Sequence, residues 1–376
     1  MKYVNLKSRV FLRDYEQKMA YNAPQDELYE VDEEAFNLFL ECNGTRTLKE
    51  LKERYGESVD YLLSEGLIEE SRERVNIEVP HSPYPSLRYI LVHITSKCNL
   101  KCEHCYVDKM GTHMDLETFE EIMDQFYRIG GLKVMLSGGE PLVHPRIEHI
   151  LKTAESYGLR VELLTNGAMI NQKYADLIKR YVDDVQISID GIKGHDLLRG
   201  EGSLEKTLRG IEYLDGVDIT VATMITRYNI GEFEELEPLV SKIAQRWLLD
   251  FPCTDQDILP PFGEAARVMA NYGFGKESYE GLPHKTCGAH LCAVTPEGNI
   301  SRCGFYEDKT VGSIEDGLSK CWDRICREHL WDLEELECEC DKIVECKGGC
   351  RYRAEFFGNG RLGKDPLMCH LFGLEE

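Results

Sequence analysis

The chain lacks the long apolar segments that membrane-spanning and exported proteins carry. No run of about 18 apolar residues occurs in its 376 residues. The N-terminal stretch MKYVNLKSRVFLRDYEQKM has no apolar core of the kind found in secretory signal peptides. Internal repeats and low-complexity tracts are absent as well. These absences predict a soluble protein of the cytoplasm.

Positive charge is scarce. The chain has 44 Lys and Arg residues against 67 Asp and Glu residues, which gives a formal net charge of −23 at pH 7. Proteins that bind nucleic acid or an anionic membrane surface need a basic face. The sequence therefore predicts neither nucleic acid nor a membrane as a partner.

Cysteine, by contrast, is abundant. The chain has 15 cysteines. It is too long to be a small disulfide-stabilised scaffold, and a reducing compartment does not favour disulfides. Three of the cysteines lie within residues 98–105, and most of the others lie from residue 287 onward. Clustered thiols in such a compartment are typical of metal ligands.

The pattern of apolar residues divides the chain into units. Residues 1–75 combine short strands with three amphipathic helices, and residues 76–88 contain three prolines and predict a linker. In residues 89–283, six β-branched strands alternate with helices, which predicts an α/β fold with a partial (β/α)6 barrel. Residues 284–376 form a cysteine-rich domain. The predicted strands are 89–95, 133–138, 160–166, 184–190, 218–226 and 246–251.

Cys98, Cys102 and Cys105 directly follow the first predicted barrel strand, in the sequence CNLKCEHC. Barrels of this kind place their chemistry at the C-terminal ends of the strands. A tetrahedral zinc site needs a fourth ligand, and His104 is poorly placed to supply it because it immediately precedes Cys105. A four-iron cluster held by three thiolates instead keeps one iron open for a cofactor. A structural zinc loop is the alternative.

This CxxxCxxC loop resembles that of the radical S-adenosylmethionine superfamily. The motifs SGGEP, LLTNG and QISIDG end the next three strands, and HDLLRG follows, in the order found in that family. The resemblance implies a [4Fe–4S] cluster whose open iron binds S-adenosylmethionine, and reductive cleavage to a 5′-deoxyadenosyl radical. The cofactor-binding residues that it implies are His104, Gly138, Gly139, Glu140, Ser188, Asp190 and Arg199.

The chemistry of these side chains agrees with such roles. Gly138 and Gly139 let the backbone approach a ligand closely. Glu140 is expected to face the ammonium group of the cofactor, Ser188 a hydroxyl or carboxylate, and Arg199 the carboxylate. A surface or turn-capping role is the alternative for Arg199 and Asp190.

The cysteine-rich domain resembles the SPASM extension of radical enzymes, which holds two auxiliary [4Fe–4S] clusters. One departure is that the family's CxxC is CxC here, with Glu337 where a cysteine normally stands. Two zinc knuckles are the alternative. The resemblance implies that Cys287, Cys292, Cys303 and Cys350 bind the first auxiliary cluster, that Cys338, Cys340, Cys346 and Cys369 bind the second, and that neither keeps an open iron.

Residues 1–75 resemble the PqqD-like winged-helix domain that recognises precursor peptides, in the stretches LYEVDEEAFNLFL and NGTRTLKEL. In that family a leader peptide adds as an edge strand to the small sheet. Winged helices also bind DNA. This segment, however, has 11 Lys and Arg residues against 17 Asp and Glu residues, which argues against DNA.

The sequence therefore predicts a radical enzyme that modifies a ribosomally synthesised peptide or protein, with a reductant such as ferredoxin or flavodoxin. The weak catalytic candidates Asp250, Cys253 and Asp255 lie at the end of the sixth strand or just beyond it. The alternative is that Cys253 is an inert loop thiol and that the two acids are simply solvated. Formylglycine-forming chemistry is disfavoured because Gly304 stands where that group has an Asp base. A maturase for a cofactor or metalloenzyme (haem-precursor or tungsten-enzyme type) and a non-catalytic iron–sulfur electron carrier are the other hypotheses.

Overall fold

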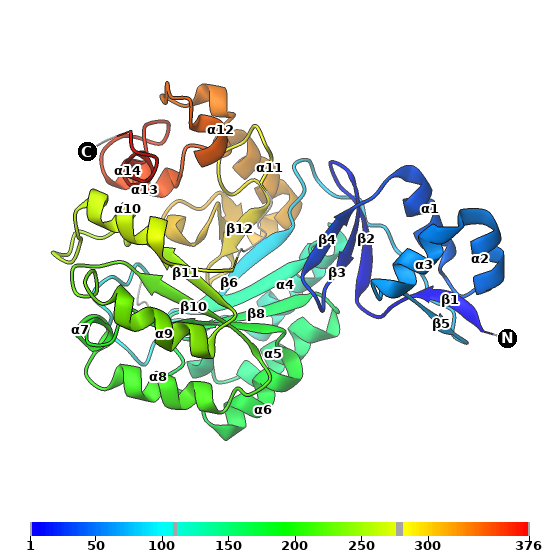
Figure 1. The fold of residues 1–376 in the computed structure, drawn as a ribbon, viewed down its shortest axis with the longest axis horizontal. Coiled ribbons are helices and arrows are strands. Elements are labelled where there is room, and N and C mark those ends of the chain that lie inside the picture. Colours follow the sequence, from blue (N-terminus) through cyan, green and yellow to red (C-terminus); the bar gives the residue numbers. More distant parts are fainter. Residues whose placement is uncertain (1, 108–110, 276–280, 375–376) are drawn as a thin grey trace.

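The computed structural model describes residues 2–107, 111–275 and 281–374. The N-terminal unit contains two small antiparallel sheets and three helices around a core of its own (Figure 1). The capping box between Thr47 and Glu50 starts the second helix. The elements of this unit are β1 (Tyr3–Leu6), β2 (Val10–Asp14), β3 (Lys18–Asn22), β4 (Glu27–Glu30), α1 (Glu33–Glu41), α2 (Leu48–Tyr55), α3 (Glu57–Ser64) and β5 (Ile68–Ser71).

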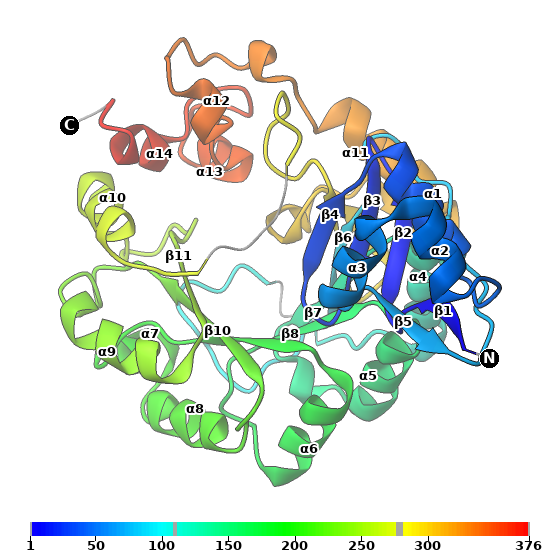
Figure 2. The same ribbon diagram turned by 45° about the vertical axis from the view of Figure 1, so that its right-hand side comes forward.

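Six parallel strands form the central sheet, in the order in which they occur along the chain. The partial α/β barrel predicted from the sequence is confirmed, and each predicted strand begins at the residue expected. Helices cover the outer face of the sheet (Figure 2). The elements are β6 (Tyr89–Thr95), α4 (Leu116–Arg128), β7 (Lys133–Gly138), α5 (Ile147–Ser156), β8 (Arg160–Thr165), α6 (Gln172–Tyr181), β9 (Asp184–Ser188), α7 (Gly194–Arg199), α8 (Ser203–Glu212), β10 (Asp218–Met224), α9 (Phe233–Ile243), β11 (Arg246–Asp250) and α10 (Phe262–Asn271).

The cysteine-rich region continues the same sheet. Strand β12 (Leu291–Val294) pairs in parallel with β6, and β13 (Asn299–Ser301) returns antiparallel to it, followed by β14 (Gly312–Ser313). The attachment of this hairpin to the barrel was not predicted from the sequence. The remaining helices are α11 (Leu318–Glu328), α12 (Ile343–Cys346), α13 (Arg351–Phe356) and α14 (Pro366–Leu371), of which α14 packs against α10.

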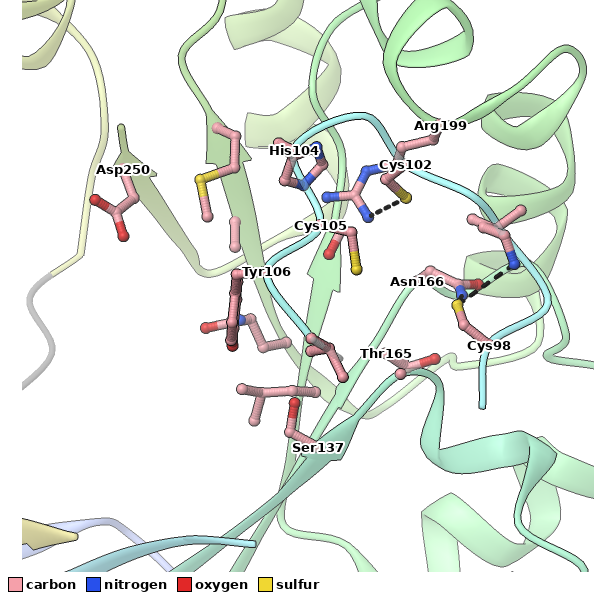
Figure 3. Close-up of a pocket in the computed structure, with 18 of the residues that line it drawn as sticks. Cys98, Cys102, His104, Cys105, Tyr106, Ser137, Thr165, Asn166, Arg199 and Asp250 are labelled. Atoms are coloured by element: carbon pink, nitrogen blue, oxygen red, sulfur yellow. Dashed lines mark hydrogen bonds between the residues drawn. The ribbon is translucent and has the colours of Figure 1, made fainter. Parts of the chain in front are cut away.

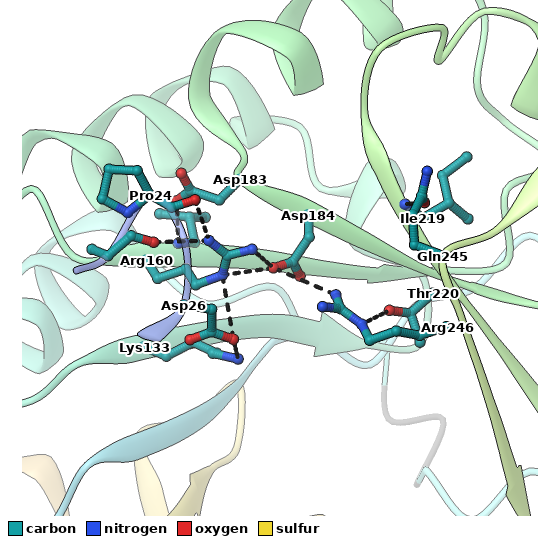
Figure 4. A network of polar contacts seen from close by, with 12 residues as sticks. Pro24, Asp26, Lys133, Arg160, Asp183, Asp184, Ile219, Thr220, Gln245 and Arg246 are labelled. Atoms are coloured by element: carbon teal, nitrogen blue, oxygen red, sulfur yellow. Dashed lines mark hydrogen bonds and ion pairs between the residues drawn. The ribbon is translucent and has the colours of Figure 1, made fainter. Parts of the chain in front are cut away.

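A buried network of charges fastens the N-terminal unit to the barrel at the N-terminal ends of its strands (Figure 4). Arg160, at the start of β8, contacts Asp184 at the start of β9 and donates to the backbone oxygens of Ala23 and Pro24 at 2.8 and 3.1 Å. Asp26 accepts from Lys133 at 2.5 Å. The C-terminal end of the predicted linker is buried at Ser86, Leu87 and Arg88, whereas Asn76, Glu78 and His81 are exposed.

Two further observations bear on the sequence predictions. All 15 cysteines are free thiols. Across residues 2–107, 111–275 and 281–374, no helix is long and apolar enough to cross a membrane.

Candidate active site and auxiliary cysteine pockets

A cavity of about 500 Å³ opens at the C-terminal ends of the barrel strands (Figure 3). Cys98, Cys102 and Cys105 all line it, as the sequence predicted for thiols that follow the first barrel strand. Of the predicted cofactor-binding residues, His104, Gly138, Gly139, Ser188 and Arg199 line the same cavity.

The two glycines bring the end of β7 against the loop that follows β6. A Cβ atom on Gly138 would lie 2.1 Å from the backbone oxygen of Thr95, and one on Gly139 would lie 2.3 Å from that of Lys97. Gly138 also has a φ of +133°, which side chains disfavour. Any larger residue would therefore push the cysteine loop away from the sheet.

Two side chains direct donors at the thiols. Asn166 Nδ2 lies 3.9 Å from Cys98 Sγ, and Arg199 Nη1 lies 3.9 Å from Cys102 Sγ. Burial raises the pKa of Cys98, and the backbone N–H of Leu100, which donates to its sulfur at 3.4 Å, offsets part of the rise. Asn166 was missed as a site residue, although it lies in the LLTNG motif quoted from the sequence.

Glu140, which was predicted to face the cofactor, lies behind the wall of the cavity. Its side chain is fully buried and does not line the cavity. It accepts hydrogen bonds from Leu142 N at 3.0 Å, Thr165 Oγ1 at 2.7 Å and Asn166 N at 2.8 Å. Through these hydrogen bonds the carboxylate orders the loop after β8.

Asp190 also lies behind the cavity wall. It is fully buried, contacts Arg199 Nε and accepts from Met224 N at 2.8 Å. Burial raises the pKa of Asp190, but Arg199, His104 and His195 together outweigh this effect and bring it below its ordinary value. Asp190 therefore orients Arg199 and does not itself reach the cavity.

Among the weak catalytic candidates, only Asp250 lines the cavity. Arg353 Nη1 lies 3.4 Å from Asp250 Oδ1. Desolvation raises the pKa of Asp250, and Arg353 offsets part of the rise. Asp255 is exposed away from the cavity, and Cys253 lies toward the cysteine-rich region, near Cys303.

A second cavity, of about 520 Å³, lies in the cysteine-rich region. Cys287, Cys303, Cys346 and Cys350 line it, together with Phe305 and Tyr352. Cys292, expected in this set, is absent from the lining: it is fully buried in the main hydrophobic core.

A third cavity, of about 230 Å³, is lined by the four cysteines expected to bind the second auxiliary cluster: Cys338, Cys340, Cys346 and Cys369. Among the residues the structure describes, no three His, Cys, Asp or Glu side chains converge as they would around a single metal ion. Thiolates that each bind a different iron of a four-iron cluster are spaced more widely. The cysteine-lined cavities suit such clusters in donor type and in number of thiols.

The arrangement of three thiols beside a glycine cradle at strand ends agrees with comparisons of the sequence. A model of the Radical SAM superfamily matches residues 92–240. The AdoMet-dependent heme synthase of Oleidesulfovibrio alaskensis is 30% identical over 351 residues, which cover 76% of this chain and 88% of that protein. The chain belongs to the radical SAM superfamily, and as an enzyme of this superfamily it uses S-adenosylmethionine and a [4Fe–4S] cluster.

Two further proteins resemble it over most of their length. The mycofactocin maturase MftC of Mycolicibacterium smegmatis is 26% identical over 319 residues, which cover 73% of this chain and 80% of MftC. The structure of Streptococcus suis SuiB bound to the precursor peptide SuiA has a TM-score of 0.67 at 12% identity, covering 97% of this chain and 99% of SuiB. The fold is thus shared along nearly the whole chain.

Proposed function

We propose that the protein oxidatively modifies a ribosomally synthesised peptide or protein, with two auxiliary iron–sulfur clusters and a reductant such as ferredoxin or flavodoxin in the cytoplasm. The observation that carries this proposal is that a series of contacting aromatic rings connects the cofactor cavity with the first auxiliary cavity. Bound S-adenosylmethionine and its cluster supply a 5′-deoxyadenosyl radical that abstracts hydrogen. The residues around the cavities must then position the substrate and accept the electron and the proton that it loses.

The aromatic wall consists of three rings in series. Tyr106 lines the cofactor cavity and its ring centroid lies 4.8 Å from that of Phe305. Phe305 stacks on Tyr352 at 5.3 Å, and both line the first auxiliary cavity. A substrate residue at Tyr106 would therefore contact a ring that is adjacent to the lining of the first auxiliary cavity. This short separation suits an electron leaving the substrate for an auxiliary acceptor.

The N-terminal unit supports a peptide substrate. Strand β4 pairs with β3 on one side only and forms the outer edge of its three-stranded sheet within the described chain. An open edge offers backbone donors and acceptors to an added strand. The leader segment of the substrate is proposed to bind there. SuiB, which shares this fold, is described in complex with its precursor peptide.

Asp250 is the proposed proton acceptor. Its carboxylate borders the cofactor cavity, and behind it Arg353 forms a two-pronged pair with Asp365, both at 2.8 Å. Asp365 Oδ2 also accepts from Cys350 N at 2.7 Å. Oxidation of a substrate releases a proton, and the half-exposed Asp250 provides a base beside the cofactor cavity. The buried Arg353 and Asp365 behind it hold a cysteine of the first auxiliary cavity in place.

Asp250→Asn is expected to lower product formation by about 10²–10⁴-fold while leaving cleavage of S-adenosylmethionine without substrate unchanged. Asparagine keeps the shape but cannot accept the proton. The measurement is the ratio of modified substrate to 5′-deoxyadenosine. Asp255→Asn, at an exposed position on the same loop, serves as the control. Equal ratios in the two variants would remove Asp250 from the mechanism.

A milder effect is expected at the cofactor. Asp190→Asn retains an acceptor for Met224 N but loses the charge that holds Arg199. The dissociation constant for S-adenosylmethionine should rise about tenfold, equivalent to about 1.4 kcal/mol. Equilibrium dialysis of the cluster-loaded protein measures it. An unchanged constant would show that Arg199 does not contact the cofactor.

The function itself is tested with the anaerobically reconstituted full chain, reduced in the presence of S-adenosylmethionine. Formation of 5′-deoxyadenosine is measured after adding the peptide fraction of a lysate of the source organism, with and without prior protease digestion. Stimulation that protease abolishes supports a peptide or protein substrate. Stimulation only by the protease-resistant small-molecule fraction contradicts it. No cleavage under any condition would favour an electron carrier.

A second candidate is the maturation of a cofactor. It is favoured by the relative with 30% identity, which is described as a heme synthase. The same lysate experiment separates the two, because a tetrapyrrole or other cofactor precursor resists protease.

A further inference from the structure

The first auxiliary cavity does not contain the four cysteines that the sequence motif implied. Cys292 lies on β12, paired with Ile90 of β6, and is completely buried. Its pKa is raised by burial and by the neighbouring thiols of Cys321 and Cys326, both of α11. Its surroundings are thus the apolar layer between the sheet and α11.

The pleat of β12 explains this placement. Successive side chains of a strand point to opposite faces. Leu291 lines the auxiliary cavity, so Cys292 faces the other way, as does Val294, which is also in the main core. To turn Cys292 toward the cavity, β12 would have to slip by one residue against β6, and this would also move Val294 out of the core.

Three thiols remain for this cavity. Cys287, Cys303 and Cys350 all line it. The fourth lining thiol, Cys346, also lines the neighbouring smaller cavity, together with Cys338, Cys340 and Cys369. It belongs with the second set.

The rest of the cavity wall suits an anionic ligand. Arg302 donates through Nη2 to Cys287 Sγ at 3.4 Å and to Cys287 O at 2.5 Å, whereas its buried Nη1 has no hydrogen-bond partner within the described residues. Tyr89, Phe305 and Met368 make other parts of the wall apolar. A thiolate suits this wall because it is a soft anion that can lie beside the Arg302 guanidinium. It is also the ligand that iron–sulfur clusters prefer.

We propose that Cys287, Cys303 and Cys350 are the only cysteines that bind the first auxiliary cluster, and that its fourth iron faces the cavity and binds an added thiolate. This rests on the proposed function in one respect, namely that an auxiliary cluster is present. Cys292 is a core residue. The chain then has two three-cysteine sets, one for S-adenosylmethionine and one for a thiol ligand.

Iron content tests the ligand set. The full chain should bind about twelve irons, as three four-iron clusters do. Cys292→Ala should retain them and continue to cleave S-adenosylmethionine, as should Cys321→Ala, which removes a thiol from the same apolar layer. Cys303→Ala should lose about four. Loss of about four irons from Cys292→Ala, but not from Cys321→Ala, would overturn the proposal.

Electron paramagnetic resonance tests the open iron without altering Cys292. The triple variant Cys98→Ala, Cys102→Ala, Cys105→Ala removes the cluster that binds S-adenosylmethionine. In thiol-free buffer, 2-mercaptoethanol should shift the g-values of the reduced auxiliary clusters, and adding Cys350→Ala should abolish the shift. An unshifted spectrum overturns the proposal. Nitrogen coupling that disappears in His290→Ala would also overturn it, by identifying an internal ligand from the cavity wall. Cleavage of S-adenosylmethionine by the unmodified chain tests the proposed function separately.

Discussion

Cys102→Ala is expected to abolish 5′-deoxyadenosine formation and to remove about four irons per chain. Cys102 is one of only three thiols at the cofactor cavity, and Arg199 lies beside its sulfur. Two thiolates cannot hold a four-iron cluster that must also leave one iron open. Iron analysis and chromatography of the reduced reaction measure both effects.

The matched control for this variant is Cys326→Ala, a partly buried thiol on α11 that lines none of the three cysteine cavities. It should leave iron content and cleavage unchanged. If Cys102→Ala retained both, the cluster would have to use another ligand, and the assignment of the loop at residues 98–105 would fail.

Arg160→Ala is expected to destabilise the protein by about 3–5 kcal/mol, because it removes the cation that contacts the buried Asp184 carboxylate and leaves only Arg246, 3.8 Å away, as its ion-pair partner among the described residues. The side chains of Arg160 and Asp184 are 3% and 2% exposed. The change also removes the donors to Ala23 and Pro24, so the N-terminal unit loses part of its attachment to the barrel. Anaerobic urea denaturation of the cluster-loaded protein measures the loss.

Arg209→Ala provides the comparison. Arg209 is 3.7 Å from Glu205 one turn away on α8, and both side chains are mostly exposed. An exposed pair of this kind contributes about 0–1 kcal/mol. Equal destabilisation by the two variants would mean that burial of the Arg160 network has no energetic consequence.

The barrel strands could be predicted from the sequence because their pattern is local. Runs such as KVMLSG and DVQIS show β-branched residues bounded by turn signals, and the structure begins each strand where the run begins. The short helix α7 and the later α10 were not predicted as elements. The pairing of β12 with β6 joins residues far apart in the chain, and no local pattern reports such a pairing.

The site was predicted to the level of the motif and not to that of the side chain. Motif and spacing identified the three thiols and the glycine cradle. Whether a motif residue faces the cavity depends on the pleat of its strand and on competing donors. Glu140 and Asp190 belong to motifs whose other residues line the cavity. Their own carboxylates, however, are bound behind the cavity wall by backbone amides and by Arg199. The pleat of β12 likewise turns Cys292 into the core, whereas Cys287 lines the first auxiliary cavity.

The attachment of β12 to β6 also has a consequence for how the chain folds during its synthesis. About 200 residues separate the two strands, so the edge of β6 remains unpaired while most of the barrel is synthesised. An unpaired edge strand is a site of aggregation. The nascent chain becomes safe from this hazard only after its cysteine-rich end emerges from the ribosome, which ties completion of the barrel to the arrival of the auxiliary thiols.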